Sequence, residues 1–136
     1  MRYALVLVLI LVLFSFFACS HLANAIKRRL SMLGILSKFV ASSGAAAILG
    51  NGQTIHNLLR IPISLKKNLT PSWHIAVNKR LGNTKLLILD EISLVSPRLL
   101  EALDFRMRAI KHNDLAFGGL HVIVLGDMFQ LKVVSD

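Results

Sequence analysis

Apolar residues dominate the first 25 positions of the chain. Residues 4–18 are apolar at all but one of 15 positions and follow a single charge, Arg2. This run is shorter than the roughly 20 residues that a membrane-spanning helix needs, but it matches the apolar part of an export signal. Residues 23–25 (Ala-Asn-Ala) fit a signal-peptidase site. We interpret residues 1–25 as an apolar helical leader, either an export signal or an anchor that contacts a membrane through residues 4–22. Translation from a wrong start site or a fused exon is the alternative.

The next stretch has apolar positions at a spacing near 3.6, which predicts an amphipathic helix. The helix is expected from Lys27 to Val40. Gly34 lies within it and weakens the prediction, because glycine has a low helix propensity. The apolar face would consist of Leu30, Leu33, Leu36 and Val40.

Turns divide the following segment into short pieces. Residues 41–44 (Ala-Ser-Ser-Gly) and 50–52 (Gly-Asn-Gly) are typical of turns. A short helix is predicted between these turns, at residues 45–49. A second short helix is predicted after them, at residues 54–59, with its threonine as the N-cap. Residues 61–84 contain two prolines and a glycine and are expected to be irregular.

Two continuous apolar runs flank an amphipathic helix further along the chain. Leu86–Leu89 and Leu120–Leu125 are typical of buried parallel strands. Between them, Ser96 followed by proline is a favourable helix start. The helix continues to about Lys111, and its apolar face carries Leu99, Leu103, Met107 and Ile110. Strand, helix and strand in this order predict a right-handed βαβ unit. We therefore expect an α/β protein with a parallel sheet flanked by helices.

Charge is distributed unevenly along the 136 residues, whose net charge is +9. Residues 1–89 hold eleven basic residues and no acid, whereas residues 90–136 hold seven acids and five basic residues, so the two parts contribute +11 and −2. This split excludes a uniformly basic, histone-like protein. It also confines carboxylate chemistry to positions from 90 onward. The single cysteine, Cys19, excludes an internal disulfide and a cysteine-rich zinc site.

Both predicted strands are followed by acids: Asp90 and Glu91 after the first, and Asp127 after the second. Ligands of open α/β sheets bind beyond the carboxyl ends of the strands. Mg²⁺ binds there through one or two carboxylates plus substrate phosphates. Four hydrophobic residues followed by Asp-Glu also match the Walker B element of P-loop NTPases, whose Asp holds Mg²⁺. In the alternative interpretation, these acids cap a helix or face solvent.

Three segments of the last third carry a family resemblance. They are residues 87–95 (Leu-Ile-Leu-Asp-Glu-Ile-Ser-Leu-Val), 117–120 (Phe-Gly-Gly-Leu) and 124–131 (Val-Leu-Gly-Asp-Met-Phe-Gln-Leu). This series resembles the Pif-type (petite integration frequency) superfamily-one DNA helicases and their relatives in Helitron transposons. Upstream, residues 41–47 (Ala-Ser-Ser-Gly-Ala-Ala-Ala) and 50–56 (Gly-Asn-Gly-Gln-Thr-Ile-His) resemble that family's DNA-contacting motif Ia.

The resemblance covers roughly residues 37–136 and implies a partial RecA-like P-loop NTPase domain. Residues 26–136 would be part of the first motor domain of a helicase that uses Mg²⁺ and ATP. Asp90 would coordinate Mg²⁺, and Glu91 would be the catalytic base. Gln130 would sense the γ-phosphate, and Asp127 would anchor the loop that carries it.

The same resemblance implies contacts with single-stranded and duplex DNA. The residues near the DNA path would be Ser42, Ser43, Thr54 and His56. The alternatives are that the two serines only form a turn with a helix cap and that His56 is a packed histidine. Basic clusters at 27–29, 66–67 and 79–80 could face phosphates or be solvated.

The chain also departs from the family pattern. No segment matches the phosphate-binding loop G-x-x-x-x-G-K-[ST], and residues 1–40 contain only Gly34 as a candidate. Lys132 and Val133 replace the usual Pro-Pro after Gln-Leu, and the sequence stops at Asp136, before a second motor domain.

Three hypotheses follow from these observations. The first is a DNA helicase that unwinds 5′ to 3′ and acts in DNA repair, recombination or telomere maintenance, in the nucleus or mitochondrion, as the family implies. The second is an inert helicase fragment. The third is a small exported or membrane-anchored basic protein, which residues 1–25 would favour.

Overall fold

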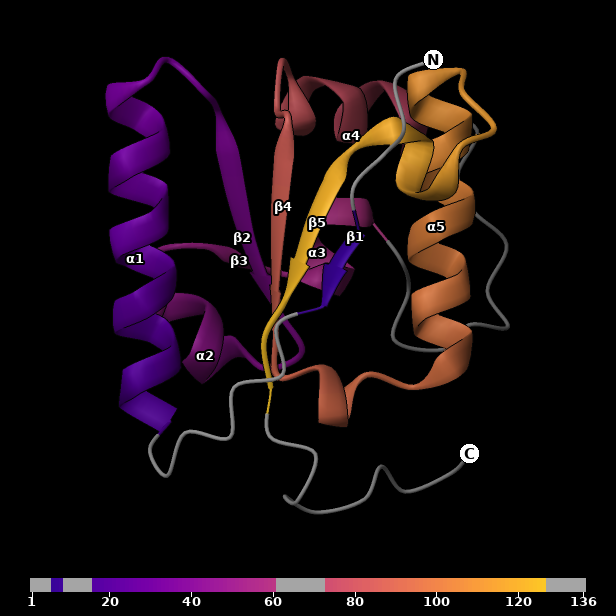
Figure 1. The fold of residues 1–136 in the computed structure, drawn as a ribbon. Coiled ribbons are helices and arrows are strands. Elements are labelled where there is room, and N and C mark those ends of the chain that lie inside the picture. The colour runs from indigo at the N-terminus through magenta and orange to yellow at the C-terminus, as the bar shows by residue number, and fades with distance from the viewer. Residues whose placement is uncertain (1–5, 9–15, 61–72, 127–136) are drawn as a thin grey trace.

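A computed structural model describes residues 6–8, 16–60 and 73–126. Its centre is a five-stranded parallel sheet with the order β1-β5-β4-β2-β3 (Figure 1). The strands are β1 (Val6–Val8), β2 (Ser37–Ala41), β3 (Gln53–Thr54), β4 (Leu86–Asp90) and β5 (His121–Val124). The α/β class with a parallel sheet is therefore confirmed.

Helices cover both faces of this sheet (Figure 1). One face packs against α1 (Phe16–Met32) and α2 (Gly44–Leu49), and the other against α3 (Ile55–Leu59), α4 (Trp73–Leu81) and α5 (Pro97–Lys111). Two short 3₁₀ helices, η1 (Ile92–Leu94) and η2 (Ala116–Gly119), flank α5 in the chain.

The first four residues of β4, Leu86–Leu89, are apolar because both faces of the strand are covered. Leu87 and Leu89 point into the larger core beneath α3, α4 and α5, whereas Ile88 packs against the side of α1 and α2. This burial on both sides is what a continuous apolar run in a parallel sheet indicates. It places the carboxyl end of β4 at the middle of the sheet.

The predicted βαβ unit is confirmed. β4 and β5 pair in parallel, with Leu87 beside Val122 and Leu89 beside Val124. All four apolar positions predicted for α5 are buried. The predicted N-caps at Thr54 and Ser96 are also present, because their hydroxyls accept hydrogen bonds from the amides of Asn57 and Leu99 at 3.2 Å each. Ser43, a cap only in the alternative interpretation, accepts from the Ala46 amide at 3.3 Å.

The single helix predicted over residues 27–40 is wrong. Helix α1 ends at Met32, and Gly34 follows with a φ of +71°, a conformation that suits glycine at a helix end. Residues 37–41 form strand β2, which pairs with β4 along its whole length. Leu33 and Leu36, two residues of the supposed apolar face, are exposed.

The apolar helix predicted for the leader is also wrong at residues 6–8. These residues form β1 and pair with Val122–Val124 of β5. Among the described residues, the first helix is α1, which begins at Phe16 and passes through residue 25. The described residues contain no helix that is both long and apolar enough for a membrane crossing. Likewise, the irregular structure predicted for 61–84 gives way to helix α4 at residues 73–81.

Candidate functional site at the carboxyl end of the sheet

The carboxyl ends of three neighbouring strands lie side by side. In the register of the sheet, Ala41 of β2 pairs with Thr54 of β3 on one side and with Asp90 of β4 on the other. The parallel direction of the strands therefore gathers the segments that follow them at one edge. This arrangement brings the predicted motif Ia residues next to the predicted Walker B acids.

Glu91 is held by two hydroxyl groups of the segment that follows β2. The hydroxyls of Ser42 and Ser43 both donate to Oε2 of Glu91, at 2.9 and 2.8 Å. The Glu91 backbone lies in the left-handed region, with a φ of 55° and a ψ of 44°. Such a conformation is costly for a residue other than glycine, and hydrogen bonds to a charged carboxylate are among the stronger ones. The two serine bonds therefore stabilise this position of the carboxylate.

Ser43 has two roles at this point. Its hydroxyl donates to Glu91 and also accepts a hydrogen bond from the Ala46 amide at the start of α2. The alternative of a helix cap is therefore confirmed for Ser43 but not for Ser42, and a contact with DNA stays a prediction. The bonds to Glu91 could not be predicted, because 48 or 49 residues separate the partners in the sequence.

Asp90 is buried at the end of β4, with 3% of its surface exposed. One of its carboxylate oxygens, Oδ1, accepts a hydrogen bond from the Glu91 amide at 2.9 Å. Burial has the largest effect on the pKa of Asp90 and raises it. The hydrogen bond from the Glu91 amide lowers this pKa and the charge of Glu91 raises it, so that the pKa lies above its ordinary value. A carboxylate desolvated in this way is suited to a cation, which would compensate its charge.

Thr54 and His56 lie one strand further along the same edge. Thr54 ends β3, and its hydroxyl is occupied by the amide of Asn57. His56 is half-buried in the first turn of α3, and burial lowers its pKa. The structure thus groups Thr54 with the serines and acids, and places His56 two residues into the adjoining helix.

Asp127 and Gln130 lie outside the described residues, so their predicted roles stay predictions. The last described residues run beside the Asp90–Glu91 turn. The Leu125 amide donates to the Leu89 carbonyl at 2.7 Å, and the Ile92 amide donates to the Leu125 carbonyl at 3.1 Å. A Cβ on Gly126 would lie 2.8 Å from Cγ2 of Ile92, so only glycine fits between β5 and η1 without a shift.

The connection from β1 to α1 occupies the place of a phosphate-binding loop in the topology. Such loops join a strand to the helix that follows it, and β1–α1 is the strand–helix pair that precedes motif Ia among the described residues. The connecting sequence is Leu-Ile-Leu-Val-Leu-Phe-Ser at residues 9–15, with neither glycine nor lysine. The chain therefore differs from the family's phosphate-binding sequence at the position between a strand and a helix where that sequence is expected, residues 9–15.

Lys27 stabilises the motif Ia region from outside the site. Its ammonium group donates to the carbonyls of Gly50 and Asn51, at 2.9 Å each, and lies 5.9 Å from the centre of the Phe39 ring. Burial, and then the charge of Lys38, lower the Lys27 pKa. Within the basic cluster at 27–29, Lys27 is thus a packing residue, a role that sequence reasoning missed.

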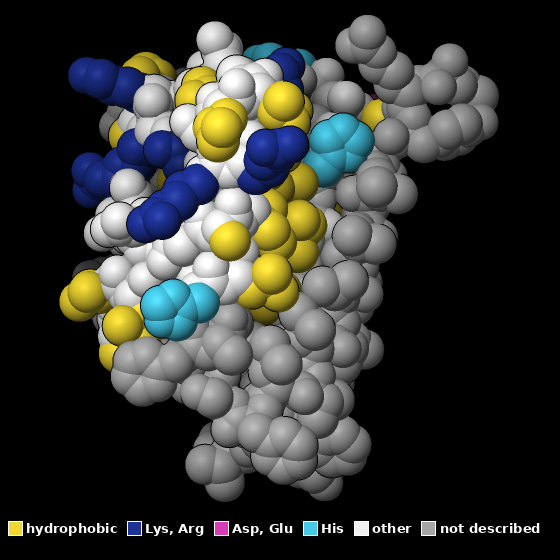
Figure 2. All heavy atoms as spheres, turned by 60° about the vertical axis from the view of Figure 1, so that its left-hand side comes forward, with side chains coloured by type: hydrophobic (Ala, Val, Ile, Leu, Met, Phe, Trp, Pro, Cys, Tyr) yellow, Lys and Arg dark blue, Asp and Glu magenta, His cyan; other side chains and the backbone are white. Residues whose placement is uncertain are grey.

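The α1 side of the molecule nevertheless presents basic groups to solvent. Figure 2 shows Lys and Arg side chains gathered on this side, next to apolar ones. Arg28 and Arg29 are exposed, as are Met32 and Leu33 near the end of the helix. Among the described residues, no group of three or more His, Cys, Asp or Glu side chains could hold a metal.

Comparisons with known proteins agree with this geometry. The model of the PIF1-like helicase family matches residues 17–136. The ATP-dependent DNA helicase RRM3 of Saccharomyces cerevisiae is 36% identical over 107 residues, which are 70% of this chain and 14% of that protein. The ATP-dependent DNA helicase Pif1 of Psychrobacter is 38% identical over 102 residues, 71% of this chain and 15% of that protein.

A solved structure shows the same similarity in three dimensions. The Pif1 helicase from Bacteroides, in complex with ADP-AlF3 and single-stranded DNA, superposes with a TM-score of 0.75 and 28% identity. The match covers 100% of this chain and 31% of that one. The chain therefore spans about a seventh of the curated relatives and about a third of this structure.

Proposed function

The chain belongs to the PIF1-like helicase family, and we propose that it acts as part of the first motor domain of a DNA helicase that unwinds DNA from 5′ to 3′. In this proposal, hydrolysis of Mg-ATP drives movement along one strand. Support comes from the family, from the RecA-like sheet, and from the position of the family's motif residues at one edge of that sheet.

The nucleotide would be handled by the acids that follow β4 and β5. Asp90 supplies a buried carboxylate, and carboxylate oxygens are ligands that Mg²⁺ prefers. Glu91 would activate the attacking water, as a general base near the γ-phosphate. Gln130 would sense the γ-phosphate, and Asp127 would hold the loop that carries Gln130.

The bonds from Ser42 and Ser43 to Glu91 are the observation that carries the proposal. The family resemblance implies that the serines lie near the DNA path. If their hydroxyls donate to DNA there, then DNA and Glu91 compete for the same two donors. DNA binding would therefore release the carboxylate from the serines and leave it available to water. In this way, hydrolysis would depend on DNA, and Thr54 and His56 would extend the DNA contact along the sheet edge.

A binding measurement tests this competition without the need for hydrolysis. Glu91→Ala removes the competitor and should tighten binding of a single-stranded oligonucleotide by about threefold or more, the effect of losing roughly 0.7 kcal/mol of competing hydrogen bonds. Glu101→Ala is the matched control, because it removes the same charge from an exposed position on α5. Fluorescence anisotropy at one fixed salt concentration would measure both. Equal affinities for the two variants would contradict the competition, and no DNA binding by any variant would contradict the proposed function.

Hydrolysis is tested by the acids themselves. Asp90→Asn and Glu91→Gln should each lower DNA-stimulated ATP turnover by about 10²-fold or more, because a positioned base alone contributes about that factor. Turnover that survives both substitutions would contradict the assigned roles.

A second candidate function is DNA binding without ATP hydrolysis. It is favoured by residues 9–15, which lack the glycines and lysine that hold the β- and γ-phosphates in P-loop NTPases. Calorimetric titration with Mg-ATP separates the two functions. Tight binding would favour the motor, whereas DNA binding with no heat from Mg-ATP would favour the second candidate.

A further inference from the structure

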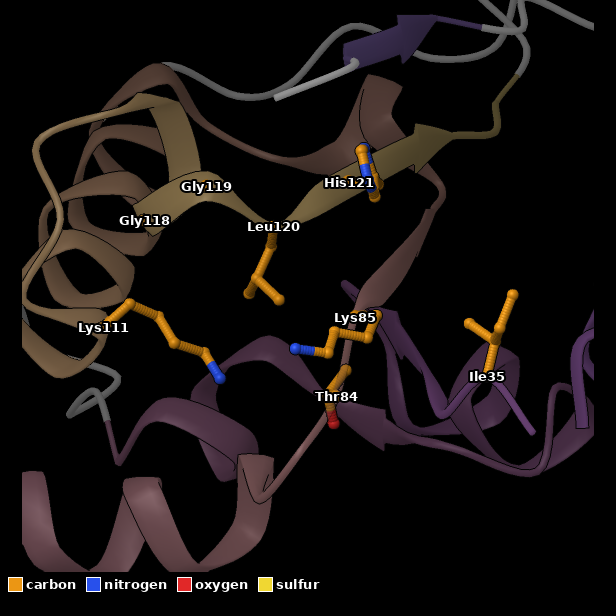
Figure 3. A pocket seen from close by; sticks show the side chains of 8 residues that line it. All are labelled: Ile35, Thr84, Lys85, Lys111, Gly118, Gly119, Leu120 and His121. Atoms are coloured by element: carbon orange, nitrogen blue, oxygen red, sulfur yellow. The ribbon is translucent and has the colours of Figure 1, made fainter. Parts of the chain in front are cut away.

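A cavity of about 490 Å³ lies at the amino end of the sheet, opposite the candidate site (Figure 3). It opens between three elements that each contribute a basic residue to its lining. Lys85 directly precedes β4, Lys111 is the last residue of α5, and His121 is the first residue of β5. Ile35 and Leu120 add apolar walls.

Two of these basic groups converge inside the cavity. Figure 3 shows the side chains of Lys85, just before β4, and Lys111, at the end of α5, extending toward each other. Burial lowers the pKa of Lys111, and the charge of Lys85 lowers it further. The Lys111 ammonium donates to the Gly82 carbonyl at 3.3 Å, which leaves further donor capacity on an ammonium that has three N–H groups.

No carboxylate among the described residues lines the cavity to balance these charges. The acid nearest in the chain to this end of α5 is Asp114, whereas Asp104, about two turns before Lys111 on α5, is engaged elsewhere. Asp104 forms an ion pair with Arg108 at 2.9 Å and accepts the Phe117 amide at 2.6 Å. The cavity therefore combines two like charges with partly apolar walls, and such surroundings strengthen the attraction of an anion.

The glycines of η2 make this arrangement possible. Gly118 has a φ of +64°, and a Cβ there would lie 2.4 Å from the Met107 carbonyl oxygen. The chain can therefore pass close to α5 and bring the start of β5 beside Lys111. The backbone at Gly118 and Gly119 also forms a wall without side chains.

We infer that this cavity binds a phosphate group through Lys85 and Lys111. A phosphate dianion matches two ammonium groups in charge, and lysine is a common point-charge ligand of phosphates. The volume lies in the range of small-molecule sites, roughly 300–1,000 Å³. The phosphate could come from a small free anion or from a nucleic-acid strand, since both present the same oxygens.

Titration of the isotope-labelled full chain with inorganic phosphate, followed by NMR, tests this inference. We expect saturable shifts of the amide signals of Thr84, Gly118 and Gly119. The double variant Lys85→Gln, Lys111→Gln should bind at least tenfold more weakly, whereas Arg98→Gln, which removes an exposed cation at the opposite end of α5, should bind like the wild type. Lys85→Arg keeps the charge and should retain binding, which separates loss of a ligand from loss of the fold.

The source of the phosphate is distinguished by two oligonucleotides of the same sequence. Shifts with a 5′-phosphorylated strand alone would indicate a terminal phosphate, shifts with both would indicate backbone phosphates, and shifts with inorganic phosphate alone would indicate a small anion. Each of these results supports a phosphate site. Absence of saturable shifts with all three probes, or equal affinity in the double variant, would overturn it.

Discussion

The two ends of strand β4 carry opposite charges and handle them in different ways. At the carboxyl end, Glu91 accepts hydrogen bonds from two serines, and Asp90 accepts one from the Glu91 amide. At the amino end, Lys85 and Lys111 converge on a cavity that no described carboxylate lines. A ligand that takes the serine hydroxyls at the carboxyl end must therefore replace Glu91, whereas a phosphate at the amino end would only add a partner to the lysines. The first arrangement suits a switch and the second suits a simple binding site.

Both ends depend on the same core, and the largest expected effect comes from disrupting it. Leu103 of α5 is fully buried beneath β4 and β5. Leu103→Ala should lower the free energy of unfolding by about 2–5 kcal/mol, the usual cost of a large buried cavity. Phe105→Ala, on the exposed face of the same helix, should change it by about 0.5 kcal/mol or less. Urea unfolding followed by circular dichroism would measure both, and similar losses would mean that α5 does not pack as described.

An intermediate effect should distinguish Ser43 from an ordinary cap. Ser96→Ala removes only the N-cap of α5 and should cost about 1 kcal/mol. Ser43→Ala removes the N-cap of α2 and a bond to the Glu91 carboxylate, so it should cost about 2 kcal/mol. In a Glu91→Ala background the cost of Ser43→Ala should fall to that of the cap alone. A double-mutant cycle from urea unfolding measures the coupling energy between Ser43 and Glu91. A coupling energy of zero would contradict a stabilising hydrogen bond between these two residues.

The smallest expected effect is the pH dependence of stability that comes from His56, near the carboxyl end of the sheet. Burial lowers the pKa of His56 below 6.5, so the unfolded chain binds its proton at a higher pH than the folded protein does. Stability should therefore decrease as pH falls from 6.5 through the lowered value. His56→Gln should remove this component of the pH dependence, and the effect should be below that of Ser43→Ala because His56 is half-exposed. Urea unfolding between pH 5 and 7 would measure it, and an unchanged slope in the variant would contradict the burial of His56.

Local patterns were sufficient for the part of the fold that depends on near neighbours. The apolar runs of β4 and β5, the face of α5 and the caps at Ser43, Thr54 and Ser96 involve residues within a few positions of each other. The same local reasoning failed for residues 37–41, where a spacing near 3.6 occurs by chance and pairing with β4 stabilises a strand instead. It failed again at residues 6–8, whose apolar sequence is compatible with a leader helix or with a strand until β5 is present beside it.

The sequence by itself predicted the chemical groups of the candidate site, because each motif of the family is a short continuous segment of the chain. Only the tertiary structure decided how these groups meet. The serines and Glu91 are nearly 50 residues apart, and the parallel register of β2 and β4 brings them into hydrogen-bond distance. The lysine cavity likewise exists only where the starts of two strands and the end of a helix converge. Contacts of this kind depend on packing between distant segments, and no local pattern of hydrophobic and polar residues records them.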